Sequence, residues 1–546
     1  MPTVILDKER LMRAAGLRID DKKLERYANA LGLELEILDN GKISIEVTPN
    51  RPDMLSAIGL ARALKYFMHR KEKFSYMIKA KPQLTVKVGN GVKKIRPYIA
   101  ALVAREVNLD EDSLRDMINF SEKFCETFGR HREKIAMGMH DLDAVKPPIV
   151  YDAFGDESFV PLNESRSMRF SEILRNNEKG REYGYTISKS GERLFPALKD
   201  AEGVLSLIPI INSNRTKVSK DTKNLFIDIT GTAKQIIEKS AGMIAADLID
   251  IGAKVEPVKI EYGRMESITP KMEKRSIKIP LAQIEEELGV KITFNDAISL
   301  ANKMGYAAEF LENNIIFEIP QYRLDILNYQ DVVEDIAIAY GYDFIQPLPV
   351  FSAQQGTLEA STVRNSELSK TMLGLGFSEV MNTYLTNETL NFKNMLKKAS
   401  NGSYVTIANA KTSSITMLRT WLIPSLMYNL SISEHDPMPH KIFELDMAFN
   451  VRNNVVAEEH HLACASEQPK QNFNDIKGVT EAILRSLNLK YELLPASDDS
   501  FIEGRCAKIV VDGREIGLFG EIHPAVLFNF GITESTMAME INLDAV

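Results

Sequence analysis

The sequence predicts a multidomain protein of the mixed α+β class, and three observations support this. Its 546 residues exceed what a single hydrophobic core usually serves, so several domains are expected. The composition, 44% hydrophobic and 26% charged, is typical of soluble globular proteins and excludes a disordered chain. Capped helical segments alternate with short apolar strands along the whole length, which indicates helices packed on sheets.

We expect an N-terminal α+β domain over residues 1–80. The segments DKERLMRAAG (7–16) and DDKKLERYANALG (20–32) each begin with Asp, a favoured N-cap, and end with Gly, a favoured C-cap. After the turn that follows them, Pro52 suits the first position of a further helix, and Asp53 suits the positive end of that helix dipole.

Three further domains are expected along the rest of the chain. Residues 81–268 open with strand-like QLTVKV and YIAALVAREV and continue through segments punctuated by Gly and Pro, which indicates a mixed α+β domain. Residues 269–347 predict the order helix, helix, strand, loop, helix, which is typical of a winged-helix arrangement. Residues 348–546 alternate helices with apolar strands, so an antiparallel sheet flanked by helices is expected.

The overall composition narrows the class of protein. Cys125, Cys464 and Cys506 are odd in number and far apart, which argues against a disulfide framework and against a CxxC-type zinc site. The net charge of −8 neither indicates nor excludes a nucleic-acid partner. The chain has no uncharged apolar run of membrane-spanning length and no signal-peptide core at its N-terminus, so a cytoplasmic protein without a membrane partner is expected.

The segment YRLDILNYQDVVEDIAIAYGYD (322–343) carries a cluster of four acids. On a helix, Asp331, Glu334 and Asp335 are spaced i, i+3 and i+4 and share one face opposite the core, while Asp325 precedes the helix. A solvated acidic face is the commoner meaning of such spacing. Oxygen ligands at this spacing also suit Mg²⁺, which binds a few carboxylates and keeps several waters. The spacing alone leaves both interpretations open.

Sequence motifs for other chemistries are absent. The chain has no GxxxxGK[ST] loop, no GxGxxG after a strand and no GxSxG elbow. His460 and His461 lack HExxH spacing, and neighbouring residues of a strand point to opposite faces. Both histidines are therefore interpreted as ordinary strand residues, and the single tryptophan, Trp421, as a core residue.

Several segments together resemble the family of phenylalanyl-tRNA synthetase β subunits. In chain order they are EVTPNRPDMLSAIGLARAL, IPQYRLDILNYQDVVEDIAIAYGYDFI, RNSELSKTMLGLGFSEVMNTYLTN, TMLRTWLIPSLMYNL and IEGRCAKIVVDGREIGLFGEIHP. The resemblance covers essentially the whole chain in the right order, which makes it far more specific than any single motif. The length resembles that of the short archaeal or eukaryotic-type subunit.

The resemblance implies a magnesium ion shared with a separate α subunit. In the family, acids at the spacing of RLDILNYQDVVEDI are assigned to this ion, and the matching positions here are Asp325, Asp331, Glu334 and Asp335. Asp335 stands where many relatives have Glu, which shortens its reach by one carbon. With the family in view, the metal interpretation of this segment is favoured over the solvated face.

The resemblance also implies that residues 348–546 adopt the antiparallel class II synthetase fold but are catalytically silent. They contain no FRxE-like or GxGxxR-like segment, and Arg419 in LRTWLIP lacks the acid expected two positions later. ATP and phenylalanine are therefore expected on the α subunit of an α2β2 heterotetramer. The role implied for residues 348–546 is to build the tetramer interface and dock tRNA(Phe).

For residues 81–268 the resemblance implies an editing hydrolase. A hydrophobic pocket rejects an added hydroxyl by only about 10²-fold, so a second site is needed to remove tyrosine from mischarged tRNA. The matching stretch is GVLSLIPIINSNRTKVSKDTKNLFIDITGT (203–232), in which we expect Asp228 to read the tyrosine hydroxyl. The other pocket candidates are Asn212, Ser213 and Thr230, with Thr216 and Thr222 as weaker candidates for placing water or the ester.

These pocket residues also have a plainer interpretation. NSNR is a good turn sequence, and LFIDIT is a good strand from which Asp228 would simply face solvent. The sequence alone does not decide between the pocket and this structural alternative.

The expected function is that of the β subunit of phenylalanine–tRNA ligase, which joins phenylalanine to tRNA(Phe) with ATP and Mg²⁺. This chain would scaffold the tetramer, contact tRNA and hydrolyse tyrosyl-tRNA(Phe). One alternative is a stand-alone tRNA deacylase that needs no α subunit. Another is a nucleic-acid-binding regulator that uses the winged-helix-like segment, although the acids on its helix would repel phosphate.

Overall fold

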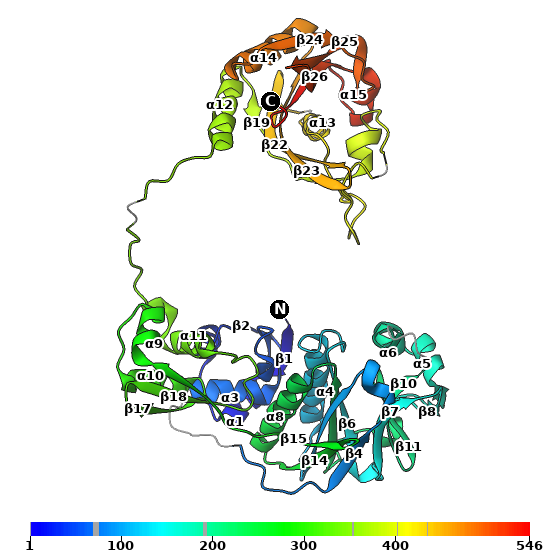
Figure 1. Ribbon diagram of the computed structural model, residues 1–546, viewed down its shortest axis with the longest axis vertical. Helices are drawn as coiled ribbons and strands as arrows, with labels where there is room; N and C mark the ends of the chain where they lie inside the picture. The colour runs from blue at the N-terminus through cyan, green and yellow to red at the C-terminus, as the bar shows by residue number, and fades with distance from the viewer. Residues whose placement is uncertain (1, 69–75, 189–193, 352–353, 401, 434) are drawn as a thin grey trace. The chain divides into compact units, whose positions relative to one another are not determined.

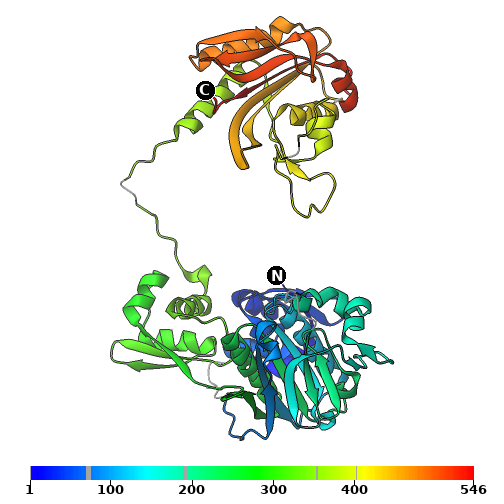
Figure 2. The same ribbon diagram turned by 45° about the vertical axis from the view of Figure 1, so that its right-hand side comes forward.

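The chain is divided into two compact units, residues 1–349 and 350–546 (Figure 1 and Figure 2). The computed structural model describes residues 2–68, 76–188, 194–351, 354–400, 402–433 and 435–546. Across these ranges, every helix is too short or too polar to cross a membrane. The three cysteines are free, as the sequence predicts, and all are buried.

The first unit begins with a three-stranded antiparallel sheet, of order β1-β3-β2, that packs against helices. Asp7 and Asp20 accept hydrogen bonds from backbone N–H groups at the starts of the first two helices, and Gly16 ends the first with a φ of 66°. These predicted caps are confirmed. The elements are β1 (Thr3–Asp7), α1 (Lys8–Ala15), α2 (Asp21–Ala30), β2 (Glu34–Ile37), β3 (Lys42–Glu46), the 3-10 turn η1 (Pro52–Leu55) and α3 (Ala57–Met68).

The helix expected to start at Pro52 is interrupted. Ser56 is extended, with φ −94° and ψ 146°, so η1 and α3 are separate elements. Asp53 is buried, and its carboxylate accepts two hydrogen bonds from the Arg51 guanidinium, at 2.9 and 2.8 Å. The prediction of one continuous helix with Asp53 at its dipole was therefore wrong, because Asp53 is engaged by an ion pair instead.

A large mixed sheet forms the middle of the first unit. Its strand order is β12-β11-β10-β7-β4-β14-β5-β13-β6, with β15 also paired to β14. Only the pairs of β4 with β7 and with β14 are parallel. The strands are β4 (Leu84–Val88), β5 (Tyr98–Arg105), β6 (Ile135–Asp141), β7 (Ile149–Phe154), β10 (Phe195–Asp200), β11 (Gly203–Leu207), β12 (Ile211–Asn212), β13 (Leu225–Gly231), β14 (Lys254–Tyr262) and β15 (Met265–Thr269).

This sheet is curled, so that its first and last strands meet. On its inner face, side chains from strands far apart in the order, such as Val86, Leu205 and Phe226, share one apolar cluster. At the seam, Asn212 Nδ2 on β12 donates to Met139 O on β6 at 3.1 Å. The accompanying elements are α4 (Glu111–Glu126), β8 (Ser158–Phe159), β9 (Met168–Arg169), α5 (Phe170–Asn176), α6 (Glu178–Tyr183), α7 (Tyr185–Ser188) and α8 (Lys234–Asp250).

The last part of the first unit is a three-stranded antiparallel sheet of order β16-β18-β17 with three helices. Capping boxes begin two of these helices, one from Thr293 with Asp296 and the other from Asn328 with Asp331. The elements are β16 (Arg275–Pro280), α9 (Leu281–Leu288), α10 (Phe294–Lys303), β17 (Ala307–Leu311), β18 (Asn314–Ile319), α11 (Tyr329–Tyr340) and the 3-10 turn η5 (Tyr342–Phe344).

The three parts of the first unit share one hydrophobic core. Buried side chains of a single cluster come from α3 (Leu60), from α8 (Ile244) and from α11 (Ile336). The boundaries expected near residues 80 and 268 therefore lie inside one compact unit.

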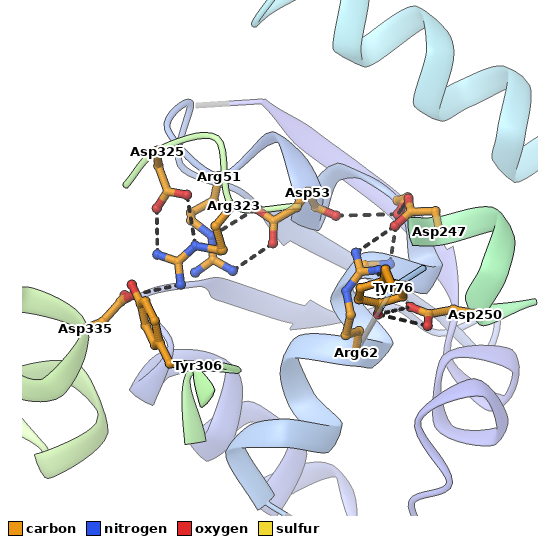
Figure 3. Close-up of polar contacts among 12 residues, drawn as sticks. Arg51, Asp53, Arg62, Tyr76, Asp247, Asp250, Tyr306, Arg323, Asp325 and Asp335 are labelled. Atoms are coloured by element: carbon orange, nitrogen blue, oxygen red, sulfur yellow. Dashed lines mark hydrogen bonds and ion pairs between the residues drawn. The ribbon is translucent and has the colours of Figure 1, made fainter. Parts of the chain in front are cut away.

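Arg62 joins the first part of this unit to the second through buried ion pairs (Figure 3). From α3, its guanidinium lies 2.7 Å from carboxylate oxygens of both Asp247 and Asp250, at the C-terminal end of α8. That end of a helix disfavours negative charge, so the arginine offsets an unfavourable dipole interaction. Burial nevertheless raises the pKa of Asp247 to about 6, and Ser56 Oγ donates to this carboxylate at 2.6 Å.

Arg323 makes a second buried cluster, within the last part of the unit (Figure 3). Its guanidinium donates to both oxygens of Asp325, at 2.9 and 2.7 Å, and lies 2.7 Å from Asp335 Oδ2. Tyr306 donates to the same Asp335 oxygen at 2.5 Å. The prediction that Asp335 lies on the face of α11 opposite the core was wrong, because it is 4% exposed and is bound by Arg323 and Tyr306.

The second unit is built on a seven-stranded sheet of order β19-β22-β23-β27-β26-β25-β24. Only the β19–β22 pair is parallel, so the antiparallel sheet expected for this part of the chain is present. Its strands are β19 (Ser378–Glu379), β22 (His440–Arg452), β23 (Val455–Glu467), β24 (Tyr491–Pro495), β25 (Phe501–Val511), β26 (Arg514–Ile522) and β27 (Thr536–Asn542).

Helices cover both faces of this sheet and give it two separate apolar cores. One core packs α12 and α14 on a face that includes Phe443 and Phe519, and the other packs α13 on a face that includes Ala463. Trp421 belongs to the second core, as predicted. The remaining elements are α12 (Ala360–Gly374), β20 (Leu385–Thr386), the π-turn η6 (Thr389–Lys393), β21 (Met417–Leu418), α13 (Ile423–Ile432), α14 (Phe473–Ser486) and α15 (Pro524–Phe530).

Replacement of Arg323 by Met should destabilise the first unit by about 3–5 kcal/mol, because two buried carboxylates would lose their cation. The measurement is urea unfolding of the full-length chain followed by far-UV circular dichroism. Arg166→Met is the matched control, since Arg166 is exposed and pairs with Glu172 at the surface; it should change the free energy of unfolding by less than about 0.5 kcal/mol. Equal stability of the two variants would contradict the role given to Arg323.

Candidate functional site

A cavity of about 260 Å³ lies at the seam where β6 and β12 meet. Asn212, Asp228 and Thr230, three of the four main pocket candidates, line it, together with Thr216. The apolar part of the wall comes from β6 and from the end of β11 with the chain that follows it. Its side chains include Met137, Met139, Leu207, Ile208 and Ile210. An apolar cavity with a few convergent polar groups is the usual form of a small-ligand site.

Asp228 lies on β13, which is paired on both sides by β5 and β6. It is only 2% exposed, so the alternative in which it faces solvent is wrong. Its partner across the sheet on β6 is Gly138, where a Cβ would lie 2.4 Å from Asp228 Oδ1. The absence of a side chain at Gly138 therefore makes the room that the carboxylate occupies.

His140 links Asp228 to Thr216. Its ring is fully buried, with Nε2 3.1 Å from Asp228 Oδ1 and Nδ1 2.8 Å from Thr216 Oγ1. An ionised carboxylate only accepts hydrogen bonds, so Nε2 carries the proton, and in the neutral ring Nδ1 accepts from the Thr216 hydroxyl. One oxygen of Asp228 and the lone pairs of Thr216 are then left to face an occupant of the cavity.

Arg96 binds Thr230 from behind the cavity wall, as His140 binds Asp228. The buried guanidinium donates to Thr230 Oγ1 at 3.0 Å through Nε and to Thr230 O at 2.7 Å through Nη2. Burial lowers the pKa of Arg96 to about 10. A guanidinium has only donors, so Thr230 Oγ1 accepts from it and keeps its own proton to donate elsewhere.

Two of the sequence candidates lie away from the cavity wall. Ser213 caps the 3-10 turn η4 (Asn214–Thr216), where its Oγ accepts from Arg215 N–H. Thr222 donates to Asp141 Oδ2 at 2.9 Å, within a separate turn. Both side chains stabilise the loop between β12 and β13, which agrees with the interpretation of NSNR as a turn.

Sequence reasoning missed three residues that organise the cavity: Arg96, Gly138 and His140. Each acts on a residue far away in the chain; His140, for example, is 88 positions before Asp228. The strand sequence IAMGMHD offered one signal, since a histidine at an inward position of an apolar strand requires a polar partner. No comparable local signal existed for Arg96.

The structure does not gather the four acids predicted to bind magnesium into one cluster of ligands within the described residues. Asp325 and Asp335 pair with Arg323, whereas Asp331 Oδ2 accepts from the N–H groups of Leu327 and Asn328. Burial opposes ionisation of Asp325, but the hydrogen bonds and charge of Arg323 outweigh it and lower its pKa. Glu334 is exposed. Within the described ranges, no group of three or more His, Cys, Asp or Glu side chains has metal-binding geometry.

Comparisons with known proteins decide the family. Relatives named phenylalanine–tRNA ligase beta subunit are 34% identical in Archaeoglobus fulgidus, 35% in Pyrococcus horikoshii and 36% in Methanococcus vannielii. Each match covers 100% of this chain and 98–100% of the relative. The chain belongs to the phenylalanine–tRNA ligase β-subunit family. The resemblance found in the sequence is thereby confirmed.

Family models and a solved structure agree with this membership. The B3/4 domain matches residues 80–247, the tRNA synthetase B5 domain residues 277–342, and the phenylalanyl-tRNA synthetase beta chain CLM domain residues 346–543. The crystal structure of an N-terminal fragment of the β subunit from P. horikoshii superposes with a TM-score of 0.60 and 35% identity, covering 62% of this chain and 100% of that one. The cavity described above lies within the B3/4 match.

A double-mutant cycle tests the buried link through His140. His140→Leu leaves Asp228 and Thr216 without a partner, so it should lower the free energy of unfolding by at least about 2 kcal/mol. Once Asp228 is also replaced by Leu, the added loss from His140→Leu should be smaller by about 1 kcal/mol or more. Urea unfolding followed by circular dichroism gives these values, and strictly additive losses would contradict the link.

Proposed function

We propose that this chain is the β subunit of a phenylalanine–tRNA ligase and that the cavity at the β6–β12 seam hydrolyses tyrosyl-tRNA(Phe). The observation that carries the editing proposal is the combination of apolar walls with the buried Asp228 carboxylate. Full-length similarity to named β subunits supports the ligase role, and it favours neither a stand-alone deacylase nor a regulator.

Discrimination against phenylalanine follows from Asp228. His140 holds one carboxylate oxygen and fixes the rotamer, which leaves the other oxygen to accept the phenolic O–H of tyrosine. Phenylalanine has no such donor, so its binding would leave a buried carboxylate oxygen unpaired. Sites built to bond a hydroxyl reject the analogue that lacks it far more strongly than a purely hydrophobic pocket does.

The hydroxyls at the cavity suit hydrolysis of the ester. Thr230, whose oxygen is already bonded by Arg96, has a proton to donate to the ester carbonyl, where negative charge develops. Thr216, whose proton is directed to His140, has lone pairs to accept from the attacking water. In our proposal these two groups orient the ester and the water, and the ring of the substrate packs on Met137 and Met139.

We further propose the four-domain division 1–80, 81–268, 269–347 and 348–546. The three-stranded sheet with α9–α11 supports a winged-helix-like third domain, and the seven-stranded sheet with helices on both faces supports a class II synthetase-like fourth domain. The fourth domain would be catalytically silent and would join an α subunit that binds ATP and phenylalanine, in a cytoplasmic α2β2 tetramer that charges tRNA(Phe).

Substitution of Asp228 by Ala should reduce hydrolysis of tyrosyl-tRNA(Phe) at least about 100-fold while leaving charging of phenylalanine unchanged, because the hydroxyl loses its acceptor. The measurement is release of labelled tyrosine by the enzyme assembled with its α subunit. Asp141→Ala is the matched control, since Asp141 lies on the neighbouring strand and bonds Thr222 outside the cavity. Unchanged hydrolysis by the Asp228 variant would remove this residue from the site.

For magnesium, the described residues do not by themselves complete a metal site. Asp325 and Asp335 are engaged by Arg323, which leaves Asp331 and Glu334 outside the ion pairs. We propose that these two acids contribute to a magnesium ion shared with the α subunit, since Mg²⁺ binds one or two carboxylates and retains waters.

Asp331→Asn combined with Glu334→Gln should reduce the increase in thermal stability that Mg²⁺ gives the assembled enzyme, because two ligands lose their charge. The measurement is the unfolding midpoint across a magnesium titration. Asp343→Asn, which changes an exposed acid just beyond α11, is the control. If the double variant responds to Mg²⁺ as the wild type does, the acids serve the fold alone.

A further inference from the structure

A second cavity, of about 620 Å³, lies in the first unit between the strand β1 and the helices α4 and α6. Thr3, Val4 and Ile5 of β1 line one side of it, and side chains of both helices line the other. The volume falls within the range of ligand-binding clefts, about 300–1,000 Å³. The cleft adjoins the β6–β12 cavity, because Arg132 lines both.

The edge of β1 that faces away from β3 has backbone groups without a partner. β1 is an outer strand of the sheet β1-β3-β2. At the end of its pairing with β3, Lys8 N–H donates to Gly41 O at 3.1 Å. Bonded and non-bonded pairs alternate in an antiparallel ladder, so the N–H and C=O groups of Thr3 and Ile5 point away from β3. No other backbone group in the described part of the chain bonds them.

These backbone groups match the repeat of another extended chain. The N–H and C=O groups of Thr3 recur at Ile5 after about 6.7 Å, twice the rise per residue of a strand. A peptide in the β conformation has donors and acceptors at the same interval, which is the basis of β-strand addition. Natural proteins commonly protect a free edge with charged residues or proline. Thr3 and Ile5 are neither, and Ile5 is 53% exposed.

Arg10 holds the two sides of the cleft together. It belongs to α1, which follows β1 directly, and its Nη1 lies 3.3 Å from Asp116 Oδ2 on α4. The same atom lies 3.5 Å from Asp110, the N-cap residue of α4. These ion pairs link the end of β1 to α4. A cleft that is fixed before binding reduces the entropy lost when a partner binds.

The charges on the helical side favour a basic peptide. Four glutamates and three cations line the cleft, and two of the glutamates pair with lysines at 2.7 and 3.5 Å. The third cation, Arg132, lies 4.3 Å from the centre of the Tyr183 ring. The remaining acids, Glu178 and Glu182 on α6, are exposed and pair with no cation among the described residues. They attract Lys or Arg and repel phosphate, so a peptide is favoured over a nucleic acid.

We propose that this cleft binds an extended, basic segment of a partner protein, which adds a strand to β1. The backbone of the segment bonds the free groups of Thr3 and Ile5, and its Lys or Arg side chains pair with Glu178 and Glu182. Binding at this edge involves none of the chemistry proposed for the β6–β12 cavity, so the two proposals stand or fall separately.

The probe is a fluorescein-labelled peptide of alternating Lys and Thr with blocked ends, titrated with the full-length chain. We expect a saturable rise in fluorescence anisotropy and at least about 10-fold weaker binding of the corresponding Glu–Thr peptide. Hydrogen exchange followed by mass spectrometry gives a second readout, because the amides of Thr3 and Ile5 should exchange more slowly when the peptide is bound. No saturable binding of the Lys–Thr peptide, equal binding of the Glu–Thr peptide, or tighter binding of a labelled single-stranded RNA would overturn the proposal.

A proline variant locates the binding at the edge of β1. Ile5→Pro removes one free N–H without breaking the ladder to β3, so it should weaken binding of the Lys–Thr peptide about 10-fold, the loss expected for one hydrogen bond. Ile37→Pro is the matched control. Leu38 N–H donates to Lys42 O, so Ile37 has the corresponding free position on β2, the other edge of the sheet and outside the cleft. Equal affinities of the two variants would contradict strand addition at β1.

Charge reversal tests the helical side without changing β1. Glu178→Lys combined with Glu182→Lys should reverse the preference, so that the Glu–Thr peptide binds more tightly than the Lys–Thr peptide. Glu111→Lys combined with Asp112→Lys is the control, because these exposed acids also begin a helix, α4, but do not line the cleft. An unchanged preference for the Lys–Thr peptide in the Glu178 and Glu182 variant would overturn the proposal.

Discussion

The first unit depends on pairs of buried charges that join segments distant in the sequence. Arg62 is almost fully buried and holds two carboxylates of α8, 185 and 188 positions later in the chain. A buried guanidinium that lost these partners would carry the full cost of desolvation, so the pairing specifies one arrangement of α3 and α8. Apolar contacts in the shared core tolerate small shifts of one helix against another. The ion pairs do not, because their donors and acceptors need a fixed geometry.

The same principle shapes the cavity at the β6–β12 seam. Its wall residues Asp228 and Thr230 owe their orientation to His140 and Arg96, which lie behind them. A polar side chain on an apolar wall can recognise a ligand only when its rotamer is fixed. A mobile side chain would turn away and form its hydrogen bonds with other groups. The polar groups of the cavity wall are therefore held by partners that are themselves buried.

Local features of the fold could be predicted from the sequence, and long-range ones could not. The caps at Asp7 and Asp20, the turn at NSNR and the strand LFIDIT depend on neighbouring residues, so the sequence is sufficient to predict them. The helix at Pro52 and the face of α11 on which Asp335 lies were mispredicted. Helical spacing does not reveal the ion pairs of Asp53 with Arg51 and of Asp335 with Arg323, nor the hydrogen bond from Tyr306 to Asp335.

For the candidate site, the family resemblance indicated which segment of the chain lines the cavity. The residues that contact this segment from other strands became known only from the structure. Asn212, Asp228 and Thr230 belong to the single segment 203–232 that resembles the family, and all three line the cavity. His140 and Gly138 reach it from another strand, through a register that only the folded sheet defines. Ser213 and Thr222 show the converse, because residues adjacent in sequence to pocket residues can serve the loop alone.

The wide separation of Arg62 from its partners has a consequence for synthesis on the ribosome. At about 5–20 residues per second, the 185 positions between Arg62 and Asp247 take on the order of 10–40 s to translate. Until then Arg62 has no carboxylate of α8 to pair with, so the first unit cannot reach its folded arrangement before α8 has been synthesised.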